Sequence, residues 1–190
     1  MTGAKAPLGR TERTRARLLK VAFELFAEKG YEQTRVADIA AAADVTEMTF
    51  YRHFGSKDQL LIDDPYDPLI AQAIAEQPLQ LDPLARTVRG IRLAWRRLPI
   101  ADEVPIRQRV AIVASTPSLL PALRASSSAT EHAIGEQLVA DGADPTAAAI
   151  AAAAAMAALI TGLTRWAVTD AGRLSDAVER SLDVLEDCNE

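Results

Sequence analysis

The chain has 190 residues, 49% of them hydrophobic, with 26 acidic side chains against 21 basic ones and a single cysteine, Cys188. This size and apolar content suit one large globular domain, or a small domain followed by a medium one, with a buried core. A lone cysteine excludes an intrachain disulfide. With no secretory signal pattern at the N-terminus, it predicts a cytoplasmic protein.

The charge is unevenly distributed along the chain. The net charge of −5 is untypical of a nucleic-acid-binding protein, but residues 1–60 hold ten bases and eight acids, a balance of +2. The remaining residues therefore carry −7. The first 20 residues hold six bases against Glu12 alone. A basic N-terminal arm before an acidic body is typical of a chain whose N-terminal part meets phosphates, although a solvated tail has the same composition.

Apolar residues recur with a helical period throughout, and no convincing strand is predicted. The first helix should end at Gly30, a residue suited to the position after a helix. Thr34 is expected to cap a short second helix, and Asp44-Val45 to break it. The apolar face of the first helix consists of Leu18, Ala22, Leu25 and Phe26.

A third helix is expected from Thr46, its cap, to about Phe54, and Gly55 should end it. Phe50 and Phe54 are one turn apart, so both should point into the core of a small domain. Residues 56–59 (Ser-Lys-Asp-Gln) have the spacing of a capping box and should start another helix at once.

Beyond residue 62, four pairs of a capping residue and a proline predict helix starts near residues 68, 83, 117 and 145. Stops are expected at Pro99, Gly142 and Gly172, and Ser175 should cap a last helix that runs to about Asp187. The predicted class is all-α. The sequence DDPYDP places a boundary at residues 62–67, so the expected domains are residues 1–62 and 63–190.

Residues 146–164 contain no charged side chain, which meets the length requirement for a membrane span. The segment is mostly alanine and is followed by Arg165. Alanine contributes little transfer energy, so a buried helix with small side chains is predicted, and no membrane partner is expected.

Two short helices joined by a tight turn, Val36–Ala43 and Thr46–Phe54, predict a helix-turn-helix. In this motif the N-terminal residues of the second helix face the bases in the major groove. Since the two phenylalanines occupy the core face, Tyr51, His53 and Lys57 are available for phosphate oxygens.

The stretch QTRVADIAAAADVTEMTFYRHFGSKDQLL resembles the DNA-binding signature of the tetracycline-repressor (TetR) family of transcriptional regulators. The matching positions are Thr34, Asp38, Ile39, Ala40, Val45, Thr49, Phe50, Tyr51, His53, Phe54, Lys57 and Leu60. Asp44 stands where the family usually has glycine, and Ala37 where it often has a basic residue. Aspartate tolerates a left-handed turn, whereas Ala37 removes one DNA contact.

The resemblance implies a homodimer on a palindromic double-stranded DNA operator, with residues 46–49 at the bases and Tyr51, His53 and Lys57 at phosphates. Glu47 and Met48 suit a cytosine amino group and a thymine methyl. The full set expected at DNA is Thr34, Arg35, Thr46, Glu47, Met48, Thr49, Tyr51, Arg52, His53 and Lys57.

The resemblance also implies a larger helical C-terminal domain for ligand binding and dimerisation, whose last two helices pack against a partner. The stretches DDPYDPLI and STPSLLPALR are similar to a TetR subgroup whose C-terminal domain is described as binding acyl-CoA-like ligands. The expected contacts of such an effector are Arg92, Trp95, Arg96, Arg107, Arg109 and Val113. These arginines could also be ordinary surface or salt-bridged groups.

No enzyme is predicted. His53 lies inside the DNA-binding motif and His132 has no nucleophile pattern near it. The sequence has no phosphate-binding glycine loop and no metal-ligand spacing, so neither a cofactor nor a metal is expected. The expected function is a ligand-responsive regulator, with repression as the family default. The alternative is an all-α protein that binds acyl groups or small molecules without DNA.

Overall fold

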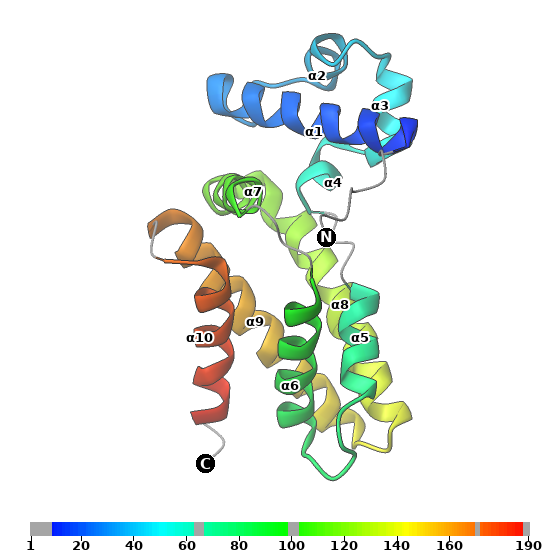
Figure 1. The fold of residues 1–190 in the computed structure, drawn as a ribbon, viewed down its shortest axis with the longest axis vertical. Coiled ribbons are helices and arrows are strands. Elements are labelled where there is room, and N and C mark those ends of the chain that lie inside the picture. Colours follow the sequence, from blue (N-terminus) through cyan, green and yellow to red (C-terminus); the bar gives the residue numbers. More distant parts are fainter. Residues whose placement is uncertain (1–8, 63–66, 99–102, 170–171, 188–190) are drawn as a thin grey trace, which may run out of the picture. The chain divides into compact units, whose positions relative to one another are not determined.

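The computed structural model describes residues 9–62, 67–98, 103–169 and 172–187, and every element within them is helical (Figure 1). The all-α prediction is confirmed. The chain divides into two compact units, Met1–Leu61 and Ile62–Glu190. The elements are α1 (Arg10–Lys29), α2 (Val36–Ala42), α3 (Glu47–Phe54), α4 (Lys57–Ile62), α5 (Asp67–Ala75), α6 (Pro83–Arg97), α7 (Val104–Ser115), the 3₁₀ helix η1 (Pro117–Leu119), α8 (Leu120–Ala140), α9 (Pro145–Thr169) and α10 (Leu174–Asp187).

The N-terminal unit has a small aromatic and aliphatic core. Leu18 and Phe26 of α1, Ile39 of α2 and the two phenylalanines of α3 are all buried. The rings of Phe50 and Phe54 lie 5.5 Å apart between centroids. The predicted core role of both phenylalanines is confirmed, and it anchors α3 from its inner face.

Local signals determine the ends of these short helices as predicted. Gly30 and Gly55 follow α1 and α3 with φ of 78° and 66°, and Asp44 takes φ of 50° in the turn between α2 and α3. The Thr46 hydroxyl accepts a hydrogen bond from the Thr49 amide at 3.2 Å. The turn and the start of α3 are therefore specified by residues within a few positions of each other.

The expectation that Thr34 caps α2 is wrong. Thr34 is fully buried, and its hydroxyl donates to the Gly30 carbonyl at 2.8 Å, just beyond α1. The hydrogen bond at the start of α2 comes instead from Asp38, whose carboxylate accepts from the Arg35 amide at 3.2 Å. A buried side chain cannot reach DNA, so the predicted DNA contact of Thr34 is also withdrawn.

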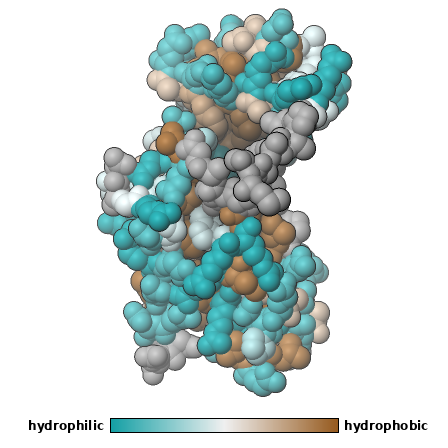
Figure 2. Space-filling model, viewed as in Figure 1, coloured by the Kyte–Doolittle hydropathy of each residue, from teal (hydrophilic) through white to brown (hydrophobic). Residues whose placement is uncertain are grey.

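In the C-terminal unit α9 is central, since it packs against α6, α7, α8 and α10, while α5 packs against α6 and α8. Its alanines make these close contacts possible. Ala151, Ala152 and Ala155 are buried in the clusters that also contain Leu138 of α8 and Leu182 of α10. On the face shown in Figure 2, hydrophilic side chains cover most of the described surface.

Several predicted helix starts in this unit are confirmed. Asp82 and Asp144 cap α6 and α9 by accepting hydrogen bonds from the amides of Ala85 and Ala147, each at 2.9 Å. The start expected near residue 117 is a 3₁₀ turn that leads into α8. The linker residues 63–66, Pro99 and Cys188 lie outside the described residues.

The start of α10 differs from the prediction. Ser175 lies inside the first turn rather than at the cap. The amide of Leu174 donates instead to the Glu103 carboxylate at 2.9 Å, 71 residues away in sequence. Glu103 directly precedes α7, a helix that no pair of capping residue and proline indicated. The two helix starts are thus joined by one tertiary contact.

Among the described residues, α9 is the one helix that is long and apolar enough to cross a membrane, judged by length and composition alone. A core helix of a globular protein meets the same criteria. One face of α9 is buried as predicted, but the opposite face is not, and Ile150 on it is 64% exposed. Packing in the core explains the apolar residues on the buried face of α9, but it does not explain an exposed apolar side chain such as Ile150.

Gly90→Ala is expected to destabilise the protein, by about 1–3 kcal/mol, because overpacking forces neighbouring backbone apart. A Cβ on Gly90 of α6 would lie 2.7 Å from the Cα of Ile74 in α5. The matched control is Gly135→Ala in α8, where a Cβ meets open space. That change should stabilise by roughly 0.5–1 kcal/mol. Urea unfolding of both variants measures the difference, and equal stability of the two would contradict the close approach of α5 and α6.

Candidate nucleic-acid interface

Most of the predicted DNA contacts lie on the outer surface of the helix-turn-helix. The side chains of Glu47, Met48, Tyr51 and Arg52 are exposed on α3, and Met48 is 76% exposed. Met48 lies at the start of the helix, and because its large apolar side chain is so exposed, it does not contribute to the core of the unit. Phe50 and Phe54 hold the opposite face of the same helix, so α3 separates packing from surface chemistry.

Arg35 lies just before α2 and is exposed, but its charge is not isolated. Its guanidinium pairs with the Asp38 carboxylate at 3.1 Å. Hydrogen bonding to Asp38 raises the pKa of Arg35, and the same bond lowers the pKa of Asp38. A phosphate would have to share this arginine with the carboxylate.

Lys57 is only partly available to a phosphate. Its ammonium donates to the carbonyls of Tyr31 and Thr34 at 2.9 and 3.0 Å, and it lies 4.0 Å from the centroid of the Tyr31 ring. These bonds use two of its three N–H groups. They join the start of α4 to the loop between α1 and α2, a structural role that the sequence prediction missed.

Tyr31 completes this contact. Its hydroxyl donates to the Asp58 carboxylate, and burial, followed by that carboxylate, raises the pKa of the phenol. Tyr31 follows the helix-ending Gly30 and carries no motif of its own. Its partners lie 26 and 27 residues away, so no local pattern indicated its role.

His53 is half-buried near the end of α3. Burial lowers the pKa of its imidazole, and the positive charges of Arg52 and Arg15 lower it further. The backbone carbonyl of His53 accepts a hydrogen bond from Arg15 of α1 at 2.6 Å. Arg15 belongs to the basic arm of the sequence, but nothing in the pattern distinguished it from Arg13 or Arg17.

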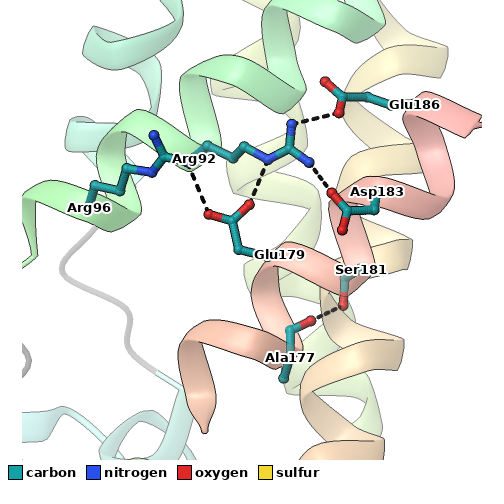
Figure 3. A network of polar contacts seen from close by, with 7 residues as sticks. All are labelled: Arg92, Arg96, Ala177, Glu179, Ser181, Asp183 and Glu186. Carbon is teal, nitrogen blue, oxygen red and sulfur yellow. Dashed lines mark hydrogen bonds and ion pairs between the residues drawn. The ribbon is translucent and has the colours of Figure 1, made fainter.

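The structure places the predicted effector-binding arginines of α6 in an ion-pair network (Figure 3). Arg92 extends from α6 to three carboxylates along α10, with Glu179 at 2.7 Å and Glu186 at 2.6 Å, and it also pairs with Asp183. Arg96 pairs with Glu179 at 3.4 Å. In the described structure these arginines join α6 to α10.

The other predicted effector contacts lie elsewhere in the C-terminal unit. The guanidinium of Arg107 lies 4.3 Å from the Trp166 ring centroid and donates to the Gly172 carbonyl at 2.9 Å. Trp95 is half-buried between two core clusters, and Val113 is buried on α7. Arg109 is half-buried on the same helix. The six residues are thus divided between the α6–α10 network, the core and α7.

A groove of about 720 Å³ runs between α9 and α10. Small residues line it on α9, including Ala154, Ala158 and Gly162, and Val184 lines it on α10. None of the six predicted effector contacts lines this groove. Among the residues that the structure describes, no group of three or more His, Cys, Asp or Glu is placed to hold a metal ion.

Both units match known protein families. The model described as "Bacterial regulatory proteins, tetR family" matches residues 18–63. The model of the MftR C-terminal domain matches residues 82–189, more than half of the chain. The first match contains the helix-turn-helix, and the second contains α6 to α10.

Individual relatives agree with these matches. The chain is 35% identical over 88 residues to the HTH-type transcriptional regulator TcmR of Streptomyces glaucescens, an alignment that covers 45% of this chain and 39% of TcmR. It is 47% identical over 57 residues to the HTH-type transcriptional repressor Rv3405c of Mycobacterium tuberculosis, covering 30% of each. The chain thus spans well under half of these curated relatives.

A solved structure extends the likeness to nearly the whole chain. NalD of Pseudomonas aeruginosa, described as the secondary repressor of the MexAB-OprM multidrug efflux pump, is 25% identical with a TM-score of 0.59. The superposition covers 93% of this chain and 96% of NalD. With the family matches in both units, the chain belongs to the TetR family, whose members are transcriptional regulators and not enzymes.

Proposed function

We propose that the protein is a cytoplasmic, ligand-responsive repressor that binds a palindromic operator as a homodimer. The exposed outer face of α3 carries this proposal. Met48 and Glu47 lie at the N-terminal end of the helix, where the second helix of the motif meets base edges. The methionine suits a thymine methyl, and the carboxylate can accept from a cytosine amino group.

Phosphate contacts are assigned to the polar groups around that face. Three of these groups lie in the second half of α3: the hydroxyl of Tyr51, the guanidinium of Arg52 and the imidazole of His53. Two more lie outside α3, namely Arg35 just before α2 and the remaining N–H of Lys57 at the start of α4. We assign Thr46 and Thr49 to positions close to the bases. Contacts of this kind set the orientation and register on the duplex, while residues 46–49 supply the sequence preference.

Selection of bound fragments from the source genome tests DNA binding directly. We expect recovery of a two-fold symmetric sequence whose half-sites are separated by about one helical turn or a multiple of it. Heparin retention with a steep salt dependence should accompany it. The alternative, an all-α carrier of acyl groups or small molecules without DNA, would yield no enriched sequence and elute from heparin at low salt.

Arg52→Gln is expected to weaken binding to all duplex sequences alike and to lower the slope of log K against log salt by about one unit per protomer. Arg52 is exposed, so the thermal midpoint should stay unchanged. Lys20→Gln is the charge-matched control, because Lys20 is exposed on α1 with a weak pair to Glu24 at 3.9 Å. Fluorescence anisotropy over a salt series measures both variants. A changed base preference with an intact slope would contradict the phosphate role.

The homodimer is supported by the exposed face of the last two helices, which we call the α9–α10 face. It consists of the groove and of three exposed apolar side chains, Ile150, Val168 and Val184, at 64%, 60% and 59% exposure. Exposed apolar side chains on the same two helices as a groove lined by small residues suit a second helix pair of the same kind. A second copy of this chain is the proposed occupant, related by a two-fold axis that matches the palindrome.

Repression is supported by a relative. Rv3405c is described as a repressor, and its 47% identity covers the length of a DNA-binding domain rather than the whole protein. A repressor and an activator can share such a domain, so the sign of regulation needs its own measurement. Transcription in vitro from the recovered operator should fall when the protein is added.

The proposed effector is an apolar molecule with an anionic end, and a fatty acyl-CoA is the named candidate. The predicted contacts comprise four arginines (Arg92, Arg96, Arg107 and Arg109) and the apolar side chains of Trp95 and Val113, and arginine forks suit phosphate groups. Since α10 carboxylates bind Arg92, a phosphate at this site would compete with them and alter the contact between α6 and α10. An effector that binds one arrangement of these helices more tightly than the other can change the free energy of DNA binding by about 1–3 kcal/mol.

Palmitoyl-CoA is expected to release a preformed operator complex, with a roughly 5- to 150-fold loss of DNA affinity at saturation. Thermal stabilisation of the free protein should accompany release, because a ligand that binds the folded state raises its stability. Coenzyme A and palmitate added separately are the controls for the two ends of the molecule. No release together with no stabilisation would remove acyl-CoA as the effector.

A further inference from the structure

Arg15 connects α1 to the last turn of α3. Its guanidinium donates to the His53 carbonyl at 2.6 Å, and the guanidinium carbon lies 4.3 Å from the centroid of the Phe54 ring. The side chain is half-buried, and these two contacts approach α3 from α1, 38 residues earlier in the chain. One cation therefore meets both a backbone acceptor and an aromatic face of the same helical turn.

The end of α3 is where such a contact has the largest effect. The last carbonyls of a helix lack intrahelical partners and carry partial negative charge, so a cation there is favourable. The helix has only eight residues and ends at Phe54, just before Gly55. A short helix depends on tertiary contacts to stay formed to its last turn. Arg15 satisfies the carbonyl of His53 and stacks on the neighbouring Phe54.

We propose that Arg15 is a positioning residue for DNA recognition: it holds the C-terminal turn of α3 against α1 and thereby sets how the outer face of α3 meets the duplex. The DNA part of this inference rests on the function proposed above. It differs from a phosphate contact, because the guanidinium acts on the protein backbone rather than on DNA. Arg17, two residues away and exposed, makes no such contact among the described residues.

Hydrogen exchange of the free protein tests the structural half without DNA. In Arg15→Gln the amides of Phe54 and Gly55 should exchange on the order of tenfold faster, the factor expected for loss of one charge-assisted hydrogen bond. The amide of Ile39 in α2 should keep its protection, which separates fraying of α3 from unfolding of the whole unit. Arg17→Gln, with the same charge change, should alter neither. Unchanged exchange at Phe54 and Gly55 in Arg15→Gln would overturn the proposal.

A histidine titration gives a second readout that simple destabilisation would not move. The charge of Arg15 contributes to the lowered pKa of His53, after burial and Arg52. Removing that charge in Arg15→Gln should raise the pKa of His53 toward its ordinary value, measured by NMR of the imidazole. A pKa of His53 that is the same in Arg15→Gln and in the unsubstituted protein would contradict the contact.

The DNA half uses the operator duplex recovered from the genome and a random-sequence duplex. We expect Arg15→Gln to lose on the order of tenfold in operator affinity and less on random DNA, with an unchanged salt slope. A slope lower by about one unit per protomer, with equal losses on both duplexes, would make Arg15 a phosphate contact and overturn the positioning role. If the unsubstituted protein bound neither duplex, the proposed function would fail. The exchange measurement would then still decide the structural half.

Discussion

Ala158→Glu is expected to produce monomers and to abolish operator binding at concentrations where the unsubstituted protein binds. Ala158 lines the groove between α9 and α10 and is only half-buried within one protomer. In a two-fold interface each substitution appears twice, so two bulky carboxylates would enter a close contact between small side chains. A monomer also contacts only one half-site of the operator. Losing the second, linked contact should lower the affinity for the operator by a factor of about 10²–10⁴.

Light scattering and operator titration measure the two effects on one sample. Ala129→Glu is the matched control, since Ala129 is exposed on α8 and outside the groove. It should leave both mass and DNA affinity unchanged. Ala154→Glu, one turn before Ala158, should repeat the loss. A monomeric mass for the unsubstituted protein at micromolar concentration would refute the proposed dimer at once.

Asp141→Asn is expected to destabilise the C-terminal unit by about 3–5 kcal/mol, because it leaves a buried guanidinium without its counter-charge. Arg86 of α6 is 2% exposed, and its Nη2 lies 2.6 Å from the Asp141 carboxylate at the end of α8. The same nitrogen donates to the Ile74 carbonyl at 3.3 Å, and the Nε is buried without a hydrogen-bond partner. The pair thus joins α5, α6 and α8.

Urea unfolding measures the loss, with Glu136→Gln as the control for the same loss of a negative charge. Glu136 is exposed and pairs with exposed His132, so its change should cost under about 0.5 kcal/mol. The double variant Arg86→Met with Asp141→Asn should recover much of the stability, because it removes the stranded charge. A double variant no more stable than Asp141→Asn would show that the buried charge is not the cause.

The stability that the Arg86–Asp141 pair contributes should depend on pH in a defined direction. Hydrogen bonds from Gln137 and then from Arg86 lower the pKa of Asp141 in the folded state. A carboxyl with a depressed pKa adds stability above its unfolded pKa of about 3.9, and that contribution disappears as pH falls through the folded pKa. Stability should therefore fall less steeply with acid in Asp141→Asn than in the unsubstituted protein.

The helix-turn-helix shows how much short-range sequence can determine. Gly30, Thr46 and Gly55 act on backbone within four residues, and Phe50 and Phe54 share a face by helical period alone. These features depend on local geometry that is the same in any protein. For that reason the motif, its core side and its exposed side could all be predicted before the tertiary structure was known.

The predictions that failed concern side chains with a choice of partners. Thr34 and Ser175 are both good capping residues, but neither caps the helix expected of it. The hydroxyl of Thr34 donates to the Gly30 carbonyl after α1, and the carboxylate of Glu103, not Ser175, accepts from the first amide of α10. Lys57 stays a proposed phosphate contact through its remaining N–H, but it also holds two carbonyls 23 and 26 residues away, a role that no local pattern indicated. A polar side chain bonds whatever group the fold brings near, and that group is not encoded next to it.

The amino-acid sequence by itself determined the helical class, most helix ends, the family of the DNA-binding unit and the face that α3 presents, because each depends on residues one or two turns apart. Only the tertiary structure decided that Arg15 supports the end of α3, that Arg92 joins α6 to three carboxylates of α10, and that Asp141 neutralises buried Arg86. Those contacts join residues 38 to 94 positions apart. Hydrogen bonds and ion pairs act over a few ångströms, so they exist only after packing has brought distant helices together.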